Sequence, residues 1–416
     1  MSEKDKIMKK KEYMTTGEVL FFCALLCEVV SLMVRMTTIP YMFEGDFCWT
    51  VLKMLRYAGY LLIVVKFALE KISQKEMIVI GGLVLLLGID STLSSRELFM
   101  MFIFIYGMKG VRFNRIMQVL LPCFIACFAM IVIGSQIGLV DNWVYGLDDG
   151  RIRYALGFFY PSHVASVLFY MTMLFCYVKK DRLKLWHVIL LELINLWQYG
   201  QTDTKAGTIL TAAALFVFYG ISRQKKDLSS GIAGKCLIFA FPGCAFLSLF
   251  ACLFYGRLPF LEGINHFLTD RIALGWRGIQ SYGIHLFGQK IQWVGHGGVG
   301  QIVDSPQGVY NYVDCSYMKI LLEHGLIVWL VIIAGFTLAS VCAVRAHEIY
   351  LAAALLFVAG YSMIEPRLLE LGFNPFMLVL AHLIGCRESF LESEEQMEML
   401  VGERNDKKDE TKVTQA

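Results

Sequence analysis

The stretch Asp314–Ala339, DCSYMKILLEHGLIVWLVIIAGFTLA, decides how the rest of the chain is organised. A helix of about 20 mostly apolar residues crosses the hydrocarbon layer of a bilayer, so the apolar run from Ile320 predicts a membrane span with a polar boundary at its start. The preceding residues, 255–315, interrupt an otherwise apolar chain with arginines, histidines, aspartates and a glycine cluster. We expect this segment to be a long loop outside the bilayer, and we expect any chemistry there.

The composition excludes a water-soluble globular protein. The chain has 416 residues, of which 57% are hydrophobic and only 18% are charged, whereas soluble domains need about a quarter charged residues to cover their surface. The 12 cysteines fall mostly in apolar runs and form no Cys-x-x-Cys pair, which is typical of reduced packing residues. The histidines lack metal-binding spacing. The sequence therefore predicts a polytopic membrane protein with no metal, no cofactor and no nucleic-acid partner.

The apolar runs predict an all-α integral membrane protein with about twelve transmembrane helices and one long extracytoplasmic loop, 255–315, between helices nine and ten. The predicted spans are 17–37, 49–70, 76–91, 94–108, 116–138, 160–178, 185–200, 206–221, 234–254, 317–341, 348–364 and 371–386. They form one membrane domain, 1–386. The remaining segment, 387–416, is charged and predicts a disordered cytoplasmic tail.

The distribution of lysine and arginine predicts the orientation. Cytoplasmic loops carry an excess of these residues, and with a cytoplasmic N-terminus and twelve spans the basic clusters all fall on the cytoplasmic side. These clusters are 1–11, 66–75, 109–115, 179–184, 223–226 and 387–408. Both termini are then cytoplasmic. No small-residue cleavage site flanks the first span, so we expect this span to be retained rather than removed as a signal peptide.

Several bases fall on the outer side in this topology, where they oppose insertion. They are Arg151, Arg153, Lys205, Arg257, Arg271, Arg277, Lys290 and Arg367. Arginine suits phosphate because its planar fork makes paired, charge-assisted hydrogen bonds, so the set favours an anion site at the outer face. The alternative is that each base pairs with a nearby acid, such as Arg271 with Asp270, or reaches lipid headgroups.

The order of four short segments resembles the O-antigen, capsule and exopolysaccharide polymerase (Wzy-type) and O-antigen ligase superfamily. In that family a loop ends in His or Asp and is followed by Leu-Leu-x-x-Gly-Leu-Ile, as in VDCSYMKILLEHGLI at 313–327. The segment 269–288, with Arg271 and a turn ending at Gly288, resembles the family's loop arginine followed by a glycine turn. The segments RYALGFFYPSH at 153–163 and TDTKAG at 202–207 resemble two further outer-loop motifs, with Lys205 where arginine is usual.

The resemblance implies a glycosyltransferase at the outer face of the cytoplasmic membrane. It would join repeat units linked to undecaprenyl diphosphate by metal-independent, inverting transfer from a lipid-linked oligosaccharide donor to a second such acceptor. On this interpretation Asp314 is the catalytic base and Arg271 stabilises the leaving diphosphate. Substrate-binding roles fall to the list Arg153, Lys205, Arg277, His324 and Tyr317. Membrane lipids, a flippase and a chain-length regulator are the further expected partners.

Other interpretations stay open at this point. Asp314 in place of the family's histidine favours a polymerase over a polysaccharide ligase. Asp314 is also suited to capping the helix that follows, because Asp accepts hydrogen bonds from free N–H groups at a helix start. A lipid-linked oligosaccharide flippase or another transporter would use the same bases to guide an anion, and it predicts basic residues deep inside spans and some repeat symmetry, neither of which is evident in the sequence. A membrane sensor is a third class.

Overall fold

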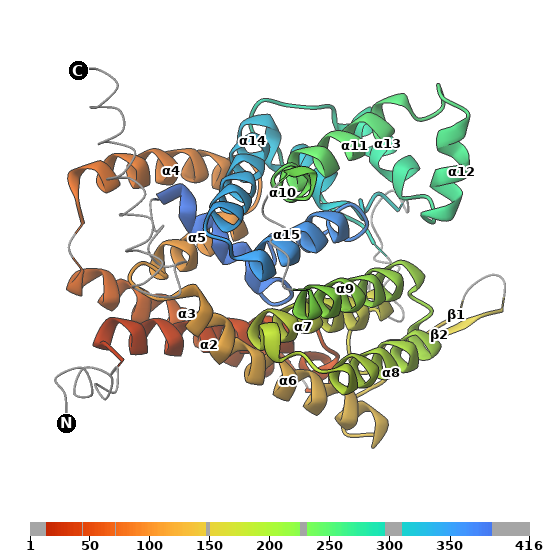
Figure 1. The fold of residues 1–416 in the computed structure, drawn as a ribbon, viewed down its shortest axis with the longest axis horizontal. Helices are drawn as coiled ribbons and strands as arrows, with labels where there is room; N and C mark the ends of the chain where they lie inside the picture. The colour runs from red at the N-terminus through yellow and green to blue at the C-terminus, as the bar shows by residue number, and fades with distance from the viewer. Residues whose placement is uncertain are drawn as a thin grey trace.

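The computed structural model describes residues 14–384 except 44, 71, 147–149, 225–230 and 296–309. Within these residues the fold is almost entirely helical (Figure 1). The helices of the first half are α2 (Thr16–Arg35), α3 (Phe47–Leu69), α4 (Gln74–Leu93), α5 (Glu97–Gly107), α6 (Phe113–Gln136), α7 (Pro161–Lys179), α8 (Leu185–Thr202) and α9 (Lys205–Arg223). The predicted tail, 387–416, lies outside the described residues.

The second half continues with helices of more varied length. They are α10 (Gly231–Ile238), α11 (Ala240–Phe254), α12 (Phe260–Phe267), α13 (Arg271–Tyr282), α14 (Ser316–Arg345) and α15 (Ile349–Tyr361). Three 3₁₀ segments, η1 (Ile39–Tyr41), η2 (Lys180–Arg182) and η3 (Pro375–Ile384), and one antiparallel hairpin of β1 (Val144–Gly146) and β2 (Ile152–Tyr154) complete the described elements. The hairpin and α12 project at the same end of the molecule in Figure 1.

Seven of the described helices are long and apolar enough to cross a membrane, and the number is eight if the bent pair α10–α11 forms one span. The seven are 16–35, 47–69, 76–93, 113–136, 161–182, 205–223 and 316–345. This is consistent with a multi-pass membrane protein, as the composition predicted. Each of the twelve predicted spans overlaps at least one described helical segment, but the structure does not show twelve full spans.

The shortfall comes from segments that are helical but short, broken or more polar. α5, α15 and η3 are apolar but have only 11, 13 and 10 residues. α8 is not among the seven, and α10 meets α11 at a bend of 59°. η3 is enclosed by α14, α5 and α6, and most of its side chains are fully buried. A segment packed inside protein does not have to cross lipid by itself, so its length is free of the span requirement.

The predicted outer loop, 255–315, contains two helices, α12 and α13, that hydropathy did not indicate. α13 packs against α11 and α14, so this segment lies against the membrane helices. On the other side of the molecule, α2 packs against α3 and α7 packs against α6, α8 and α9 (Figure 1). α15 contacts α7, α9, α11 and α14, and it therefore joins the two groups of helices.

Candidate functional site

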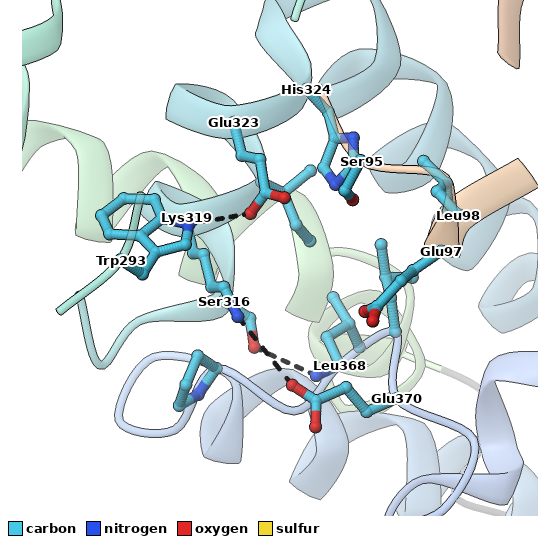
Figure 2. Close-up of a pocket in the computed structure, with 13 residues that line it drawn as sticks. Ser95, Glu97, Leu98, Trp293, Ser316, Lys319, Glu323, His324, Leu368 and Glu370 are labelled. Atoms are coloured by element: carbon cyan, nitrogen blue, oxygen red, sulfur yellow. Dashed lines mark hydrogen bonds and ion pairs between the residues drawn. The ribbon is translucent and has the colours of Figure 1, made fainter. Parts of the chain in front are cut away.

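A cavity of about 240 Å³ lies where the start of α14 meets the turn between α4 and α5. We call it the acidic cavity. Figure 2 shows the carboxylates of Glu97, Glu323 and Glu370 pointing toward the same space from three different elements. The remaining lining residues are Ser95, Leu98, Trp293, Ser316, Lys319, Ile320, His324, Pro366, Leu368 and Leu369. In the predicted topology this is the outer end of the molecule.

The carboxylates of the acidic cavity are held to different degrees. The indole Nε1–H of Trp293 donates to Glu323 Oε2 at 2.9 Å. Glu370 accepts two hydrogen bonds from Arg367 Nη1 at 2.8 and 3.0 Å. Within the described residues Glu97 has no ion-pair partner, and its side chain is exposed at the first turn of α5. The cavity therefore offers acceptors that are fixed in place and one that is free to meet a ligand hydroxyl.

A break in α14 shapes one wall of this cavity. Gly325 has φ 79° and ψ 174° inside the helix, a conformation that is essentially restricted to glycine. The loop that follows α13 fills the break. Leu326 N donates to His285 O at 2.9 Å and Gln289 N donates to Glu323 O at 2.9 Å. The broken turn therefore keeps its backbone groups hydrogen-bonded, and two of the predicted motif segments, 269–288 and 313–327, contact each other here.

His324 points from the broken turn toward α4. Its Nδ1 lies 2.8 Å from Asp90 Oδ2 and 3.1 Å from Ser94 Oγ. All three side chains are buried. Polar groups inside membrane helices are costly unless they meet one another, so this cluster accounts for His324 as a link between α14 and α4. The ring also lines the acidic cavity, so a contact between His324 and a ligand stays a prediction.

Arg271 is the first residue of α13, and most of its N–H donors are bonded to protein groups. Its Nε donates to Ile364 O at 2.6 Å, and Nη2 contacts Glu365 Oε1 at 3.2 Å. Nη1 donates to Leu268 O and to Thr269 Oγ1. A guanidinium has five N–H donors, so the structure leaves Arg271 one donor at most. These contacts favour a role for Arg271 in positioning Glu365 over a role in binding a diphosphate directly.

The charges around Arg271 act on one another. The carboxylates of Glu365 and Asp314 outweigh the effect of burial and raise the pKa of Arg271. Burial raises the pKa of Glu365 to about 7, against the opposing effect of Arg271. The structure therefore brings the two predicted catalytic residues, Arg271 and Asp314, within electrostatic range of each other and adds a third charged group, Glu365.

Ser316 connects this charged cluster to the acidic cavity. Its Oγ donates to Glu365 O at 2.7 Å and accepts from Leu368 N at 3.1 Å, and the same residue lines the cavity. α14 begins at Ser316 with Cys315 in the cap position and no side-chain cap. Asp314 therefore precedes the cap position, contrary to the interpretation of Asp314 as the helix cap.

The other predicted binding residues fall into two groups. Arg153 Nε donates to Thr202 O at 2.7 Å, and its guanidinium lies 5.5 Å from the centre of the Tyr160 ring, so the hairpin is tied to the turn before α9. Lys205 and Arg277 are exposed. Tyr317 is buried, and its hydroxyl donates to Ala359 O at 2.9 Å. Tyr317 therefore packs α14 against α15 and does not line the acidic cavity.

Three of the outer bases form ion pairs, and the partner of Arg271 differs from the one expected. Arg271 pairs with Glu365 rather than with Asp270, whose Oδ1 accepts from Asn265 Nδ2 at 2.7 Å. Arg367 pairs with Glu370 at 2.8 Å. Arg151 pairs with Asp203. Glu365 and Asp203 are distant in sequence from their partners, whereas Glu370 lies only three residues from Arg367.

A second cavity, of about 370 Å³, was missed by the sequence interpretation. We call it the basic cavity. Its lining consists of Arg35, Trp49, Lys53, Arg56, Tyr57, Tyr60, Arg96, Glu97 and Met100. Glu97 lines both cavities. One sequence signal was present: Lys53 and Arg56 lie three residues apart near the start of a span and so share a helix face.

No three His, Cys, Asp or Glu side chains form a metal-binding group in the part of the chain that the structure describes. No known protein family, curated protein or solved structure matches this chain. The resemblance of the four motif segments therefore stays an expectation, and the function is argued from the two cavities and the charged cluster between α13 and α14.

Proposed function

We propose that this protein is a membrane glycosyltransferase that joins lipid-linked oligosaccharide repeat units, as the resemblance to Wzy-type polymerases implies. One observation carries the proposal. The acidic cavity, with carboxylates from Glu97, Glu323 and Glu370, adjoins the cluster of Arg271, Asp314 and Glu365 at Ser316.

The lining of the acidic cavity suits a sugar. Carboxylates accept hydrogen bonds from ligand hydroxyls, and Glu323 and Glu370 are each fixed by a donor from the protein. Trp293 contributes an aromatic ring beside these acceptors. A sugar needs several oriented acceptors and an apolar face, so preorganised groups of this kind favour binding because little side-chain freedom is lost.

The proposed reaction is a direct displacement at the anomeric carbon. An acceptor hydroxyl oxygen forms a bond to that carbon, the bond from the carbon to the diphosphate oxygen breaks, and the electron pair leaves with the lipid diphosphate. The hydroxyl proton passes to a carboxylate, for which Asp314 is our candidate. Arg271 is a positioning residue in this scheme because it holds Glu365 and the carbonyl of Ile364. A single displacement inverts the anomeric centre.

The membrane arrangement is part of the proposal. Seven to eight long apolar helices support a multi-pass protein, and the positive-inside distribution supports cytoplasmic termini. We place both cavities at the outer face of the cytoplasmic membrane, with twelve helical segments that include the short helices α5 and α15. Donor and acceptor would then reach the cavities laterally from the outer leaflet.

The test is a reconstituted reaction. Purified protein in liposomes is supplied with undecaprenyl-diphosphate-linked repeat units in the presence of EDTA, and products are separated by chain length. We expect wild-type protein to form polymer and Asp314→Asn to lose at least about a hundredfold in rate, which is typical of a removed general base. Arg257→Gln, which changes an exposed base away from both cavities, is the matched control. No polymer from wild-type protein, or full activity in Asp314→Asn, would remove the assigned role.

A lipid-linked oligosaccharide flippase is the second candidate, and one observation favours it. Arg56 binds the fully buried Glu28 at 2.9 Å between α2 and α3, so an ion pair does lie within spans, as transport pathways often require. A flippase would move a fluorescent lipid-linked oligosaccharide across the liposome membrane without lengthening it. Transport without polymer would therefore replace the first proposal with the second.

A further inference from the structure

The basic cavity has more cationic groups than the protein itself neutralises. Four bases, Arg35, Lys53, Arg56 and Arg96, line it together with a single carboxylate, that of Glu97. Arg56 is already bound to Glu28, with which it forms contacts of 2.9 to 3.1 Å. Within the described residues the other three bases form no ion pair with a carboxylate, and Arg35 lies within electrostatic range of Glu28.

Aromatic rings complete the walls of this cavity. The Arg35 guanidinium lies 5.8 Å from the centre of the Trp49 ring, and the Arg56 guanidinium lies 5.9 Å from that of Tyr60. Arg56 Nη2 also donates to the Tyr60 hydroxyl at 2.9 Å. These contacts orient Arg35 and Arg56 and leave their charge in place. Two of the four bases are therefore held in a defined orientation at the cavity wall.

The size of the cavity indicates a multiatomic anion. Its volume of about 370 Å³ corresponds to roughly a dozen water molecules at about 30 Å³ each, which is far more than a monatomic ion requires. Arginine forks match phosphate oxygens, and lysine acts as a point charge beside them. A phosphate or diphosphate group therefore fits the lining better than chloride or a carboxylate.

The position of the cavity indicates that the anion belongs to a lipid. α3 supplies most of the lining, and only 17% of its most apolar 18 residues are buried inside the protein. Its apolar side chains Met54 and Leu61 are 64% and 63% exposed and flank the bases on the same helix. A ligand with a charged head in the cavity and a hydrocarbon tail along α3 would satisfy both surfaces.

We infer that the basic cavity binds the phosphate-bearing headgroup of a lipid in the outer leaflet through Arg35, Lys53 and Arg96. The identity of that lipid rests on the proposed function: because Glu97 lines both cavities, a diphosphate in the basic cavity places the first attached sugar at the entrance of the acidic cavity. The lipid is then the undecaprenyl diphosphate of the donor. A bulk anionic phospholipid shares the phosphate chemistry and is the competing source.

The experiment measures binding and needs no turnover. Purified full-length protein in detergent is titrated, under native mass spectrometry, with undecaprenyl diphosphate, phosphatidylglycerol and inorganic pyrophosphate as separate probes. The test variant is Lys53→Gln/Arg96→Gln, because both side chains are exposed and neither supports a buried partner. The matched control is Arg257→Gln/Lys290→Gln, which removes the same charge from exposed positions outside both cavities.

We expect the test variant to bind undecaprenyl diphosphate about 30-fold more weakly, from about 1 kcal/mol for each lost base near a membrane surface, and the control to stay within about twofold of wild type. The variant Lys53→Arg/Arg96→Lys keeps both positive charges and should bind undecaprenyl diphosphate as the wild type does. Equal loss for the test and control variants would overturn the site. Phosphatidylglycerol binding as tight as that of undecaprenyl diphosphate would overturn the donor assignment. Binding with these properties in a protein that makes no polymer would instead fault the proposed function.

Discussion

Replacing Gly325 by alanine tests whether the broken turn of α14 is what holds the wall of the acidic cavity. A Cβ at this position would lie 2.4 Å from the carbonyl carbon of Phe287 and 2.6 Å from its oxygen. Both atoms belong to the backbone, so the collision cannot be relieved by a side-chain rotation. The loop at 285–289 must move away from the break, or α14 must become regular and expel it.

The expected loss of stability follows from two terms. The Gly325 conformation, φ 79° and ψ 174°, costs a residue with a side chain about 1–3 kcal/mol. Withdrawal of the loop removes three backbone hydrogen bonds, from Leu326 to His285, from Ile327 to Leu286 and from Gln289 to Glu323, at about 1 kcal/mol each. The sum is roughly 4–6 kcal/mol. At about 2.1 cal/mol/K per residue, 416 residues convert this to a fall in Tm of roughly 5 °C.

Two measurements check the prediction. The first is the intrinsic-fluorescence melt of purified Gly325→Ala in detergent, with Gly263→Ala as control because its added Cβ meets nothing within 4 Å. The second is the rate of tryptic cleavage at the exposed Lys290, which should rise when the loop leaves the break. A Tm within about 1 °C of wild type, together with unchanged cleavage, would refute the assignment of the loop as a structural part of α14.

Three further perturbations address the charged groups. Because burial raises the pKa of Glu365 to about 7, the folded protein holds a proton that the unfolded chain has released between about pH 4.5 and 7, so Tm should fall as pH rises through this window; melts of Glu365→Gln should lose that slope. His324→Ala should lower Tm more than the same change combined with Asp90→Asn, since it leaves a buried carboxylate without its partner; equal melts would exclude the coupling. Glu370→Ala removes the two carboxylate acceptors of Arg367, whose Nη2 still donates to His163 Nε2 at 2.7 Å, and should destabilise by roughly 2 kcal/mol, read as a Tm shift; an unchanged Tm would mean that the pair contributes nothing.

Hydropathy located the helices because the segregation of apolar residues is a local property of the chain. It overestimated the spans where a helical segment is enclosed by protein, as in η3 and α15, since burial against other helices requires the same apolar residues as burial in lipid. It also missed α12 and α13. α13 has only 12 residues and mixes apolar with polar ones, and its buried face packs against α11 and α14.

The candidate site could be predicted only in its parts. Arg271 and Asp314 follow from motif order, and the structure brings them within electrostatic range of each other. Glu97 and Trp293 carry no motif and enter the acidic cavity only because α5 and a loop from the far half of the chain meet there. His324 looked like a residue beside the site, yet its hydrogen bond to Asp90 joins positions 234 residues apart, which no local pattern encodes.

The distribution of free donors determines where an anion can bind. Arg271 looked like the natural ligand of a diphosphate, but four of its five N–H donors are bonded to Ile364, Glu365, Leu268 and Thr269, so binding an anion there would first break contacts within the protein. Arg35 and Arg96 face a cavity with no such cost within the described residues. An anion gains most where the protein has left positive charge uncompensated, and for this chain that place is the basic cavity, one residue away from the acidic one.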